Sequence, residues 1–273
     1  MIHIGQYIEA AIEWLTDHFA PFFDVLNIGI GGFISGFQEI LFAVPFYITI
    51  SLFVLLAWFK SGKGTSIFTL LGLLLIYGMG FWKETMETLA LVLSSSFIAL
   101  LLGIPLGIWT ANNNRCHKIM RPILDFMQTM PAFVYLIPAV LFFGLGTVPG
   151  AFATIIFAMP PVVRLTGLGI LQVPKSVTEA ARSFGATRRQ QLFKVQLPLA
   201  LPTILTGINQ TIMMSLSMVV IAAMISAGGL GEVVLKGITQ MKIGLGFEGG
   251  IGVVILARSE EHTSELQSRQ CIS

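Results

Sequence analysis

The chain has 273 residues, of which 55% are hydrophobic and only 11% charged, and its mean hydropathy is +0.83. Soluble domains of this size carry about 25% charged residues, so the composition excludes an ordinary soluble protein and indicates an all-α polytopic membrane protein. The formal net charge is only +2, and we predict the lipid bilayer, not a nucleic acid, as the surroundings of this chain.

Residues 1–40 predict an amphipathic helix. Apolar residues recur at helical spacing from Tyr7 to Phe19, with Glu9, Glu13 and Asp17 on other faces. This pattern is typical of a helix that lies on a membrane surface or on the protein itself. A short soluble cap helix fits the pattern equally well.

Six apolar segments follow that are each long enough to span a bilayer, which takes about 20 residues. Two of them form the region 41–87, and the others lie within 88–257. The glycines within these segments favour close helix contacts, for example at Gly78, Gly103 and Gly107. The segments are Leu41–Phe59, Gly64–Trp82, Thr88–Trp109, Pro122–Gly144, Gly150–Ile170 and Thr203–Ala227.

A seventh apolar segment, Gly249–Ala257, ends early. Its nine residues would rise about 13 Å as a helix, less than half of a hydrocarbon core of ~30 Å. The following stretch, Arg258–Ser268, resembles the translation of a common sequencing-library adapter. We therefore predict that residues 258–273 are a non-native tail that truncates the seventh span. The alternative is a genuine polar tail that follows a re-entrant segment.

The basic residues indicate the orientation, because short cytoplasmic loops are rich in Lys and Arg. With the N-terminus outside, eleven basic residues fall in inner loops, and only Lys83, Lys236 and Lys242 fall in outer loops. The eleven are Lys60, Lys63, Arg115, Lys118, Arg121, Arg164, Lys175, Arg182, Arg188, Arg189 and Lys194. The bias predicts a multi-pass protein with its N-terminus outside and residues 171–202 in the cytoplasm.

Residues 171–202, here called the polar loop, interrupt the apolar sequence with a basic, helix-forming stretch. Ser176 and Glu179 have the spacing of a capping box, and Thr187 with Gln190 repeats it. Gly185 supplies a residue that ends a helix in the left-handed conformation. Pro198 is expected to break the chain before it re-enters the membrane near Pro202. The pattern predicts a compact helix–turn–helix.

The polar loop resembles the cytoplasmic EAA signature of type I ABC importer permeases. That signature reads Glu-Ala-Ala, three residues, Gly, nine residues, Ile-x-Leu-Pro, and Val195 in place of Ile is the only departure. The matching positions are Glu179, Ala180, Ala181, Gly185, Leu197 and Pro198. The resemblance implies that this loop docks in a groove of a separate ATP-hydrolysing subunit. Helix capping alone is the simpler interpretation of Glu179, and both roles are compatible.

Two further segments resemble permeases for glycine betaine, proline betaine and related quaternary-ammonium osmoprotectants. They are residues 127–139 and residues 227–232, and the two extra helices before a five-helix core fit the same family. The resemblance implies transport across a bacterial inner membrane and an extracytoplasmic solute-binding protein as a partner. It also implies a second permease subunit, which is either another copy of this chain in a homodimer or a close relative of it. A permease for methionine or another amino acid is the nearer alternative.

Prolines within two predicted spans, Pro122–Gly144 and Gly150–Ile170, indicate bent helices that wall a transport pathway. Aromatic side chains there can face a quaternary ammonium group, although packing is the simpler interpretation for each. The candidates to line the pathway are Phe126, Met130, Pro131, Phe133 and Tyr135. We expect Gly228–Gly231 to act as a flexible gate or a contact for the binding protein.

Asp125 is the only acidic residue within a predicted span, where an ionisable group is a functional candidate. Arg121 lies four residues earlier, so local pairing explains Asp125 more simply. Arg164 is expected to reach the lipid headgroups. A single acid gives little support to an ion-coupled secondary transporter, which is the remote alternative. A purely structural membrane subunit would not explain the match to the EAA signature.

The sequence predicts no enzyme activity and no cofactor for this chain. No phosphate-binding P-loop occurs in the sequence. The segment Ser61–Thr65 is the nearest candidate, but Gly64 follows its lysine where the motif requires Ser or Thr. ATP is therefore expected to bind to the partner subunit. The cysteines and histidines do not have the spacing of disulfide partners or of metal ligands, so neither a disulfide nor a metal site is predicted. These residues are Cys116, Cys271, His3, His18, His117 and His262.

Overall fold

The structure, a computed structural model, describes residues 4–270, and it describes the side chains of residues 14–15, 18–59 and 62–259. Over residues 4–270 the backbone forms helices and short connections without a strand, which confirms the all-α class. In chain order the elements are α1 (Ile4–Ala43), α2 (Phe46–Ser61), α3 (Lys63–Gly78), α4 (Trp82–Asn112), α5 (Asn114–Thr129), the 3₁₀ turn η1 (Ala132–Tyr135), α6 (Leu136–Phe143), α7 (Thr147–Leu171), α8 (Lys175–Ser183), α9 (Arg188–Gln191), the π-helical turn η2 (Leu192–Gln196), α10 (Leu197–Ser217), α11 (Val219–Ala223), α12 (Gly229–Thr239) and α13 (Ile243–Gln270).

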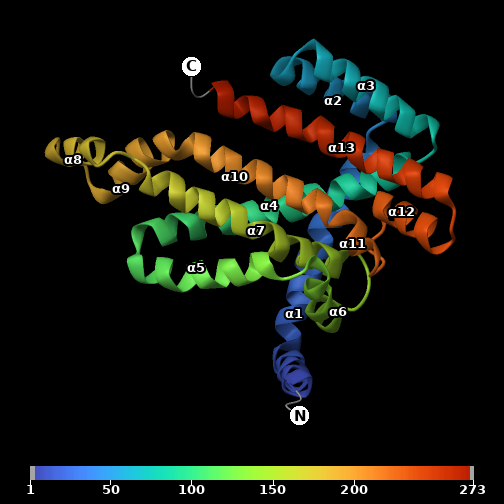
Figure 1. Cartoon of the computed structure of the whole chain (residues 1–273), viewed down its shortest axis with the longest axis horizontal. Coiled ribbons are helices and arrows are strands. Elements are labelled where there is room, and N and C mark those ends of the chain that lie inside the picture. Colours follow the sequence, from blue (N-terminus) through green and yellow to red (C-terminus); the bar gives the residue numbers. More distant parts are fainter. Residues whose placement is uncertain (1–3, 271–273) are drawn as a thin grey trace.

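Helix α7 packs against α4 and α10, and these two contacts are the most extensive between the described helices (Figure 1). Glycines bring the helices close together. A Cβ atom added to Gly107 of α4 would lie 2.6 Å from Cβ of Thr166 in α7. One added to Gly207 of α10 would lie 3.2 Å from Cα of Val162. Small residues at the contacts are what hold helices together where lipid removes the hydrophobic driving force. Gly78, by contrast, meets nothing within 4 Å.

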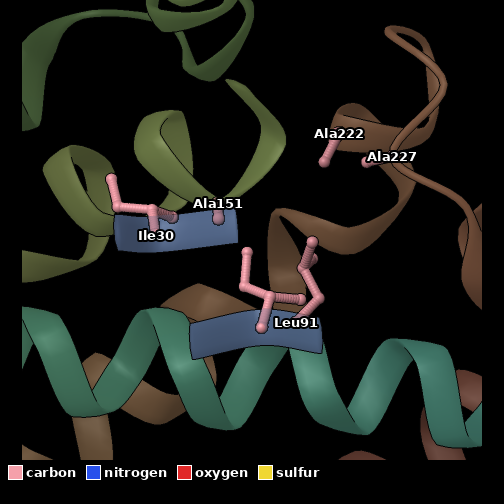
Figure 2. Packing of buried hydrophobic residues seen from close by; sticks show 6 residues of the cluster. Ile30, Leu91, Ala151, Ala222 and Ala227 are labelled. Carbon is pink, nitrogen blue, oxygen red and sulfur yellow. The ribbon is translucent and has the colours of Figure 1, made fainter. Parts of the chain in front are cut away.

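Helix α1 crosses the bundle instead of running along it (Figure 1). Its C-terminal half is anchored by a small apolar cluster that contains Ile30 and Ile34 of α1 together with Leu91 of α4, Ala151 of α7 and the alanines Ala222 and Ala227 (Figure 2). The helix extends well beyond Tyr7–Phe19, the stretch whose spacing predicts an amphipathic helix, and it kinks at Phe19, just before Pro21. The side chains of Tyr7, Ile8, Ala11 and Ile12, on which that prediction rests, lie outside the described residues.

Two prolines divide segments that the sequence analysis treated as single spans. The predicted span Leu41–Phe59 is interrupted at Pro45, where α1 has ended and α2 begins. The predicted span Pro122–Gly144 is broken at Pro131, and the two parts are bent by 110°. The cause is local: a residue before proline avoids the helical region, and Met130 is extended at φ −70°, ψ 135°. The bend expected from the prolines is present there, and it is a complete break between two helices.

By length and hydropathy, four helical segments within residues 4–270 can cross a bilayer, or five if the bent pair counts as one. The four are His18–Ala43, Trp82–Asn112, Thr147–Leu171 and Arg188–Ala223. Helices α2 and α3 are apolar but have 16 residues each, so they extend for only about 24 Å. The seven predicted spans are therefore not all long, straight helices. The part of α1 from His18 to Ala43 is long and apolar enough to span a membrane, although α1 crosses the bundle.

The region after α11 contains a helix that the sequence analysis missed. Gly228 and Gly229 both have positive φ, 82° and 74°, and α12 begins there. Its N-terminus is held on α4, because Gly229 N–H donates to Glu87 Oε2 (3.2 Å) and Leu230 N–H donates to Thr88 Oγ1 (2.8 Å). Helix α13 then starts at Ile243, earlier than the Gly249 predicted for the last span, and continues through Arg258 to Gln270.

Candidate functional site

The first half of the polar loop is the short helix α8, which begins directly after α7. Pro174 occupies its N-cap without any side-chain cap, so the helix starts at Lys175 and the capping box predicted for Ser176 and Glu179 is wrong. Proline fixes the backbone before the helix but offers no side-chain oxygen, and Ser176 is already inside the first turn. No residue of α8 is buried.

Gly185 ends α8 as predicted. Its φ is 81°, in the left-handed region that favours glycine. Gly185 N–H donates to the carbonyl of Arg182 (2.9 Å) and Ala186 N–H to that of Ala181 (3.0 Å). This pair of bonds is the Schellman motif, which satisfies the last carbonyls of the helix and sets a sharp turn. The direction of the chain after α8 therefore depends on one glycine.

The second half of the polar loop opens with the predicted capping box, which is confirmed. Thr187 Oγ1 accepts from Gln190 N–H (3.3 Å), and Gln190 Oε1 accepts from Thr187 N–H (2.9 Å). Helix α9 follows and continues without a break through η2 into α10.

Pro198 does not break the chain, contrary to the prediction. The π-helical turn Leu192–Gln196 precedes it, and Leu197 N–H donates back to the carbonyl of Leu192. Pro198 then falls in the first turn of α10, where its missing N–H has no helical partner to lose. Pro202 lies within the same helix. The backbone is therefore helical without interruption from α9 into α10.

A partly buried hydrogen bond joins the two halves of the polar loop. Arg182 Nε of α8 donates to Gln191 Oε1 of α9 at 3.0 Å, and Gln191 is only 5% exposed. Arg189 lies over the ring of Phe193, with its guanidinium carbon 5.9 Å from the ring centre. The Arg182–Gln191 bond ties α8 to α9, and these two helices are here called the elbow.

The elbow presents an unpaired acid and an exposed aromatic ring. Glu179 and Ala180 are exposed and Ala181 is half-buried. The Glu179 carboxylate forms no hydrogen bond or ion pair with any described side chain or backbone group, so helix capping does not account for it. Phe184 is 92% exposed. Sequence reasoning missed Phe184 as a site residue, and its signal was a phenylalanine directly before the helix-ending Gly185.

The candidates to line a pathway lie around the break at Pro131. Phe126 and Phe133 are 65% and 56% exposed, and Met130 is half-buried. Tyr135 is 6% exposed, packs edge-on against Phe157, and donates a hydrogen bond to the Met127 carbonyl across the break. In this conformation Tyr135 therefore fixes the bend, while the two phenylalanines present their rings outward.

Asp125 pairs with a different residue from the one predicted. Its carboxylate forms an ion pair with Arg164 of α7, not with Arg121 on its own helix. Arg164 reaches across from α7 to bridge the two helices. A cavity of about 430 Å³ lies beside this pair.

At the opposite end of the bundle, charged side chains surround the start of α12. Lys236 pairs with Glu232 at 2.8 Å, and this hydrogen bond raises the pKa of the Lys236 ammonium above its usual value. Lys83 lies 3.8 Å from Glu87, the residue that also accepts from Gly229. The predicted gate segment Gly228–Gly231 is thus tied to α4 in this conformation.

The comparisons with known proteins agree with this arrangement. The sequence model of the family described as "Binding-protein-dependent transport system inner membrane component" matches residues 103–257. The chain is 51% identical to the glycine betaine/proline betaine transport system permease protein ProW of Escherichia coli (strain K12), over 94% of this chain and 73% of that protein. It is 50% identical to the glycine betaine transport system permease protein OpuAB of Bacillus subtilis (strain 168), over 94% and 91%.

Among solved structures, the chain is similar to the MetNI methionine ABC transporter in its inward-facing conformation. The TM-score is 0.63 at 22% identity, and the match covers 70% of this chain and 95% of that chain. At this identity the likeness concerns the fold.

Proposed function

The chain belongs to the family of binding-protein-dependent transport system inner membrane components, and we propose that it is the permease subunit of an ATP-driven importer for glycine betaine, proline betaine and related solutes. Over 94% of its length, the chain is 51% and 50% identical to two permeases named for glycine betaine. The polar loop carries the coupling part of the proposal, because it is a stiff, exposed elbow between α7 and α10.

The exposed face of α8 is the proposed docking surface for the ATPase subunit. Glu179 offers an unpaired carboxylate, and the small side chains of Ala180 and Ala181 let another surface come close. Gly185 sets the turn, and Leu197 and Pro198 begin the helix that receives the motion. ATP itself binds to the partner subunit.

Closure of two ATPase subunits around ATP is proposed to move this elbow. Because α8 follows α7 and α9 continues into α10, the displacement is applied to two helices that pack extensively against each other. Packed interfaces switch between discrete arrangements, so the movement changes which side of the membrane the pathway faces. The chain catalyses no covalent step in this scheme.

The pathway is proposed to form between two copies of this chain, with a separate extracytoplasmic binding protein delivering the solute. Phe126, Met130, Pro131 and Phe133, at the bend between α5 and α6, are the proposed lining residues, with Tyr135 behind them. Aromatic faces attract quaternary ammonium groups, which supports this placement. The excess of Lys and Arg on the polar-loop side supports an N-terminus outside.

Uptake into proteoliposomes that hold the ATPase subunit and ATP inside, with the binding protein outside, tests the substrate and the energy source. These vesicles should accumulate labelled glycine betaine, vesicles without ATP should not, and an uncoupler should leave uptake unchanged. Unlabelled methionine should not compete. Uptake that collapses with the proton gradient would establish the secondary transporter instead, and competition by methionine would establish the amino-acid alternative.

Crosslinking tests the docking surface separately. A photoreactive residue at position 179 should capture the ATPase subunit in membranes. The same residue at position 118 is the matched control, because Lys118 is also exposed and lies on α5, at the same end of the bundle. Equal capture from both positions, or none from 179, would contradict the proposed role of α8.

A further inference from the structure

The cavity beside Asp125 combines basic groups with apolar walls. Its volume is about 430 Å³, and it lies between α4, α5 and α7. It sits toward the end of the bundle that carries the polar loop, because α7 runs from here directly into α8. Its polar lining residues are Thr110, His117, Arg121, Asp125 and Arg164, and five of the others are Met120, Leu124, Val163, Leu168 and Leu171.

The charges around the cavity do not balance. Arg164 is paired with Asp125. The side chains of Arg121 and His117 have no ion pair or hydrogen bond with any residue that the structure describes. Even with a neutral imidazole, one guanidinium is left without a counter-charge. An unpaired charge near the membrane interior is costly, so the cavity favours an anion.

The position and the walls of the cavity indicate what kind of anion fits. Arg121 lies seven residues into α5 and Arg164 seven residues before the end of α7, so each is about 10 Å inside the helix end. Leu168 and Leu171, 45% and 56% exposed, continue the cavity as an apolar surface. A ligand with a charged head and apolar chains matches both parts.

We propose that this cavity binds the phosphate group of an acidic phospholipid, with Arg121 as the main donor and His117 as the second. A guanidinium can donate two parallel hydrogen bonds to phosphate oxygens. Basic pockets between membrane helices on the cytoplasmic side suit phospholipid headgroups. The acyl chains would lie along Leu168 and Leu171. The site is independent of the transported solute, so it does not rest on the proposed function.

A binding measurement on the intact transporter tests the site. The permease with its ATPase subunit is reconstituted in nanodiscs of phosphatidylcholine that contain a trace of photoreactive phosphatidylglycerol, and lipid attached to the permease is quantified. The variants are Arg121→Gln and His117→Gln. Lys118→Gln is the matched control, because Lys118 lies on α5 but does not line the cavity. Wild-type nanodiscs with added inorganic phosphate form a second arm.

The expected result is labelling of α5 or α7 that falls about tenfold or more in Arg121→Gln, because a hydrogen bond to a charged group is lost. It should fall less in His117→Gln and stay unchanged in Lys118→Gln. Thermal unfolding of each variant in detergent separates lost binding from lost folding. Displacement of the lipid by inorganic phosphate would identify a free anion as the ligand. Equal loss in Lys118→Gln, or no labelling of α5 and α7, would overturn the site.

Discussion

Helices α5 and α7 lie beside each other in the bundle, yet they are attached to it in different ways. Fifteen of the 25 residues of α7 are buried, whereas only Cys116 and Leu124 of the 16 residues of α5 are. Helix α7 meets α4 and α10 through glycines and small residues, and α5 meets its neighbours through a few side chains and one ion pair. One helix is part of the packed core, and the other lies against it.

This difference indicates which helices can transmit a displacement and which can respond to it. A tightly packed interface has few intermediate arrangements, so α7, with α10, should move as a unit when the polar loop moves. Helix α5 has little buried surface to lose and is bent by 110° from α6 at Pro131. It can therefore change its angle at low cost, and the residues proposed to line the pathway lie at its C-terminal end and at the break that follows it.

The largest effect is expected from breaking the packing of α7. In Gly107→Leu, the added side chain would collide with Thr166 and with the Val163 carbonyl, which lie 2.6 and 2.8 Å from a Cβ at that position. The free energy of unfolding should fall by about 3 kcal/mol or more. Thermal unfolding of the purified protein checks this. Gly64→Leu is the control, since nothing lies within 4 Å there; equal destabilisation would mean that helix contacts are not the cause.

A smaller effect on stability, but a specific effect on transport, is expected at Gly185, in the turn between α8 and α9. Gly185→Val forces a β-branched residue to φ 81° at a cost of about 1–3 kcal/mol. The protein should insert, while ATP hydrolysis no longer drives uptake, because the elbow changes its direction. Paired ATPase and uptake assays measure this.

Gly62→Val is the matched control for that turn. Gly62 has φ 86° and lies between α2 and α3, away from the polar loop. It should show a similar cost in stability and normal coupling. Coupling lost in both variants, or kept in Gly185→Val, would remove the polar loop from the mechanism.

The helices of the packed core were easier to predict from the sequence than the segments that pack against them. Apolar length predicts α4 and α7, glycine spacing predicts contacts such as that of Gly107, and the Thr187 box and Gly185 specify the second half of the polar loop and the end of α8. These signals are local, so a single sequence contains them. The polar loop could be located as the candidate site because its signature, too, lies within one short stretch of chain.

Errors arose where the outcome depends on neighbouring turns or distant helices. Both Pro198 and Pro131 interrupt apolar sequence. The helix nevertheless continues past Pro198 through a π-helical turn, whereas it ends before Pro131, where Met130 is extended. Asp125 has Arg121 at helical spacing, and only the packing of α5 on α7 brings Arg164 nearer. Helix α12 was missed because its N-terminus is capped by Glu87, which is far away in sequence.

A modest effect is expected from releasing α5. Both partners of the Asp125–Arg164 pair are more than one-third exposed, so Asp125→Asn should cost only about 0.5 kcal/mol of stability. Spin labels on α5 and α7 should report a broader range of distances, because one link between the helices is gone. A double-mutant cycle with Arg164→Gln isolates the pair. An unchanged distance distribution would show that packing alone holds α5.

The smallest effect on the permease itself is expected at Phe184, which contrasts most with the buried residues of α7. Its ring is 92% exposed, so Phe184→Ala should change the free energy of unfolding by less than about 0.5 kcal/mol. Affinity for the ATPase subunit should nevertheless fall about tenfold, because exposed aromatic residues commonly anchor interfaces. Phe247→Ala is the control, since Phe247 is 71% exposed but lies on α13, outside the polar loop. If both variants bind the ATPase as the wild type does, Phe184 is not part of the docking surface, and Glu179 and the alanines make the contact without it.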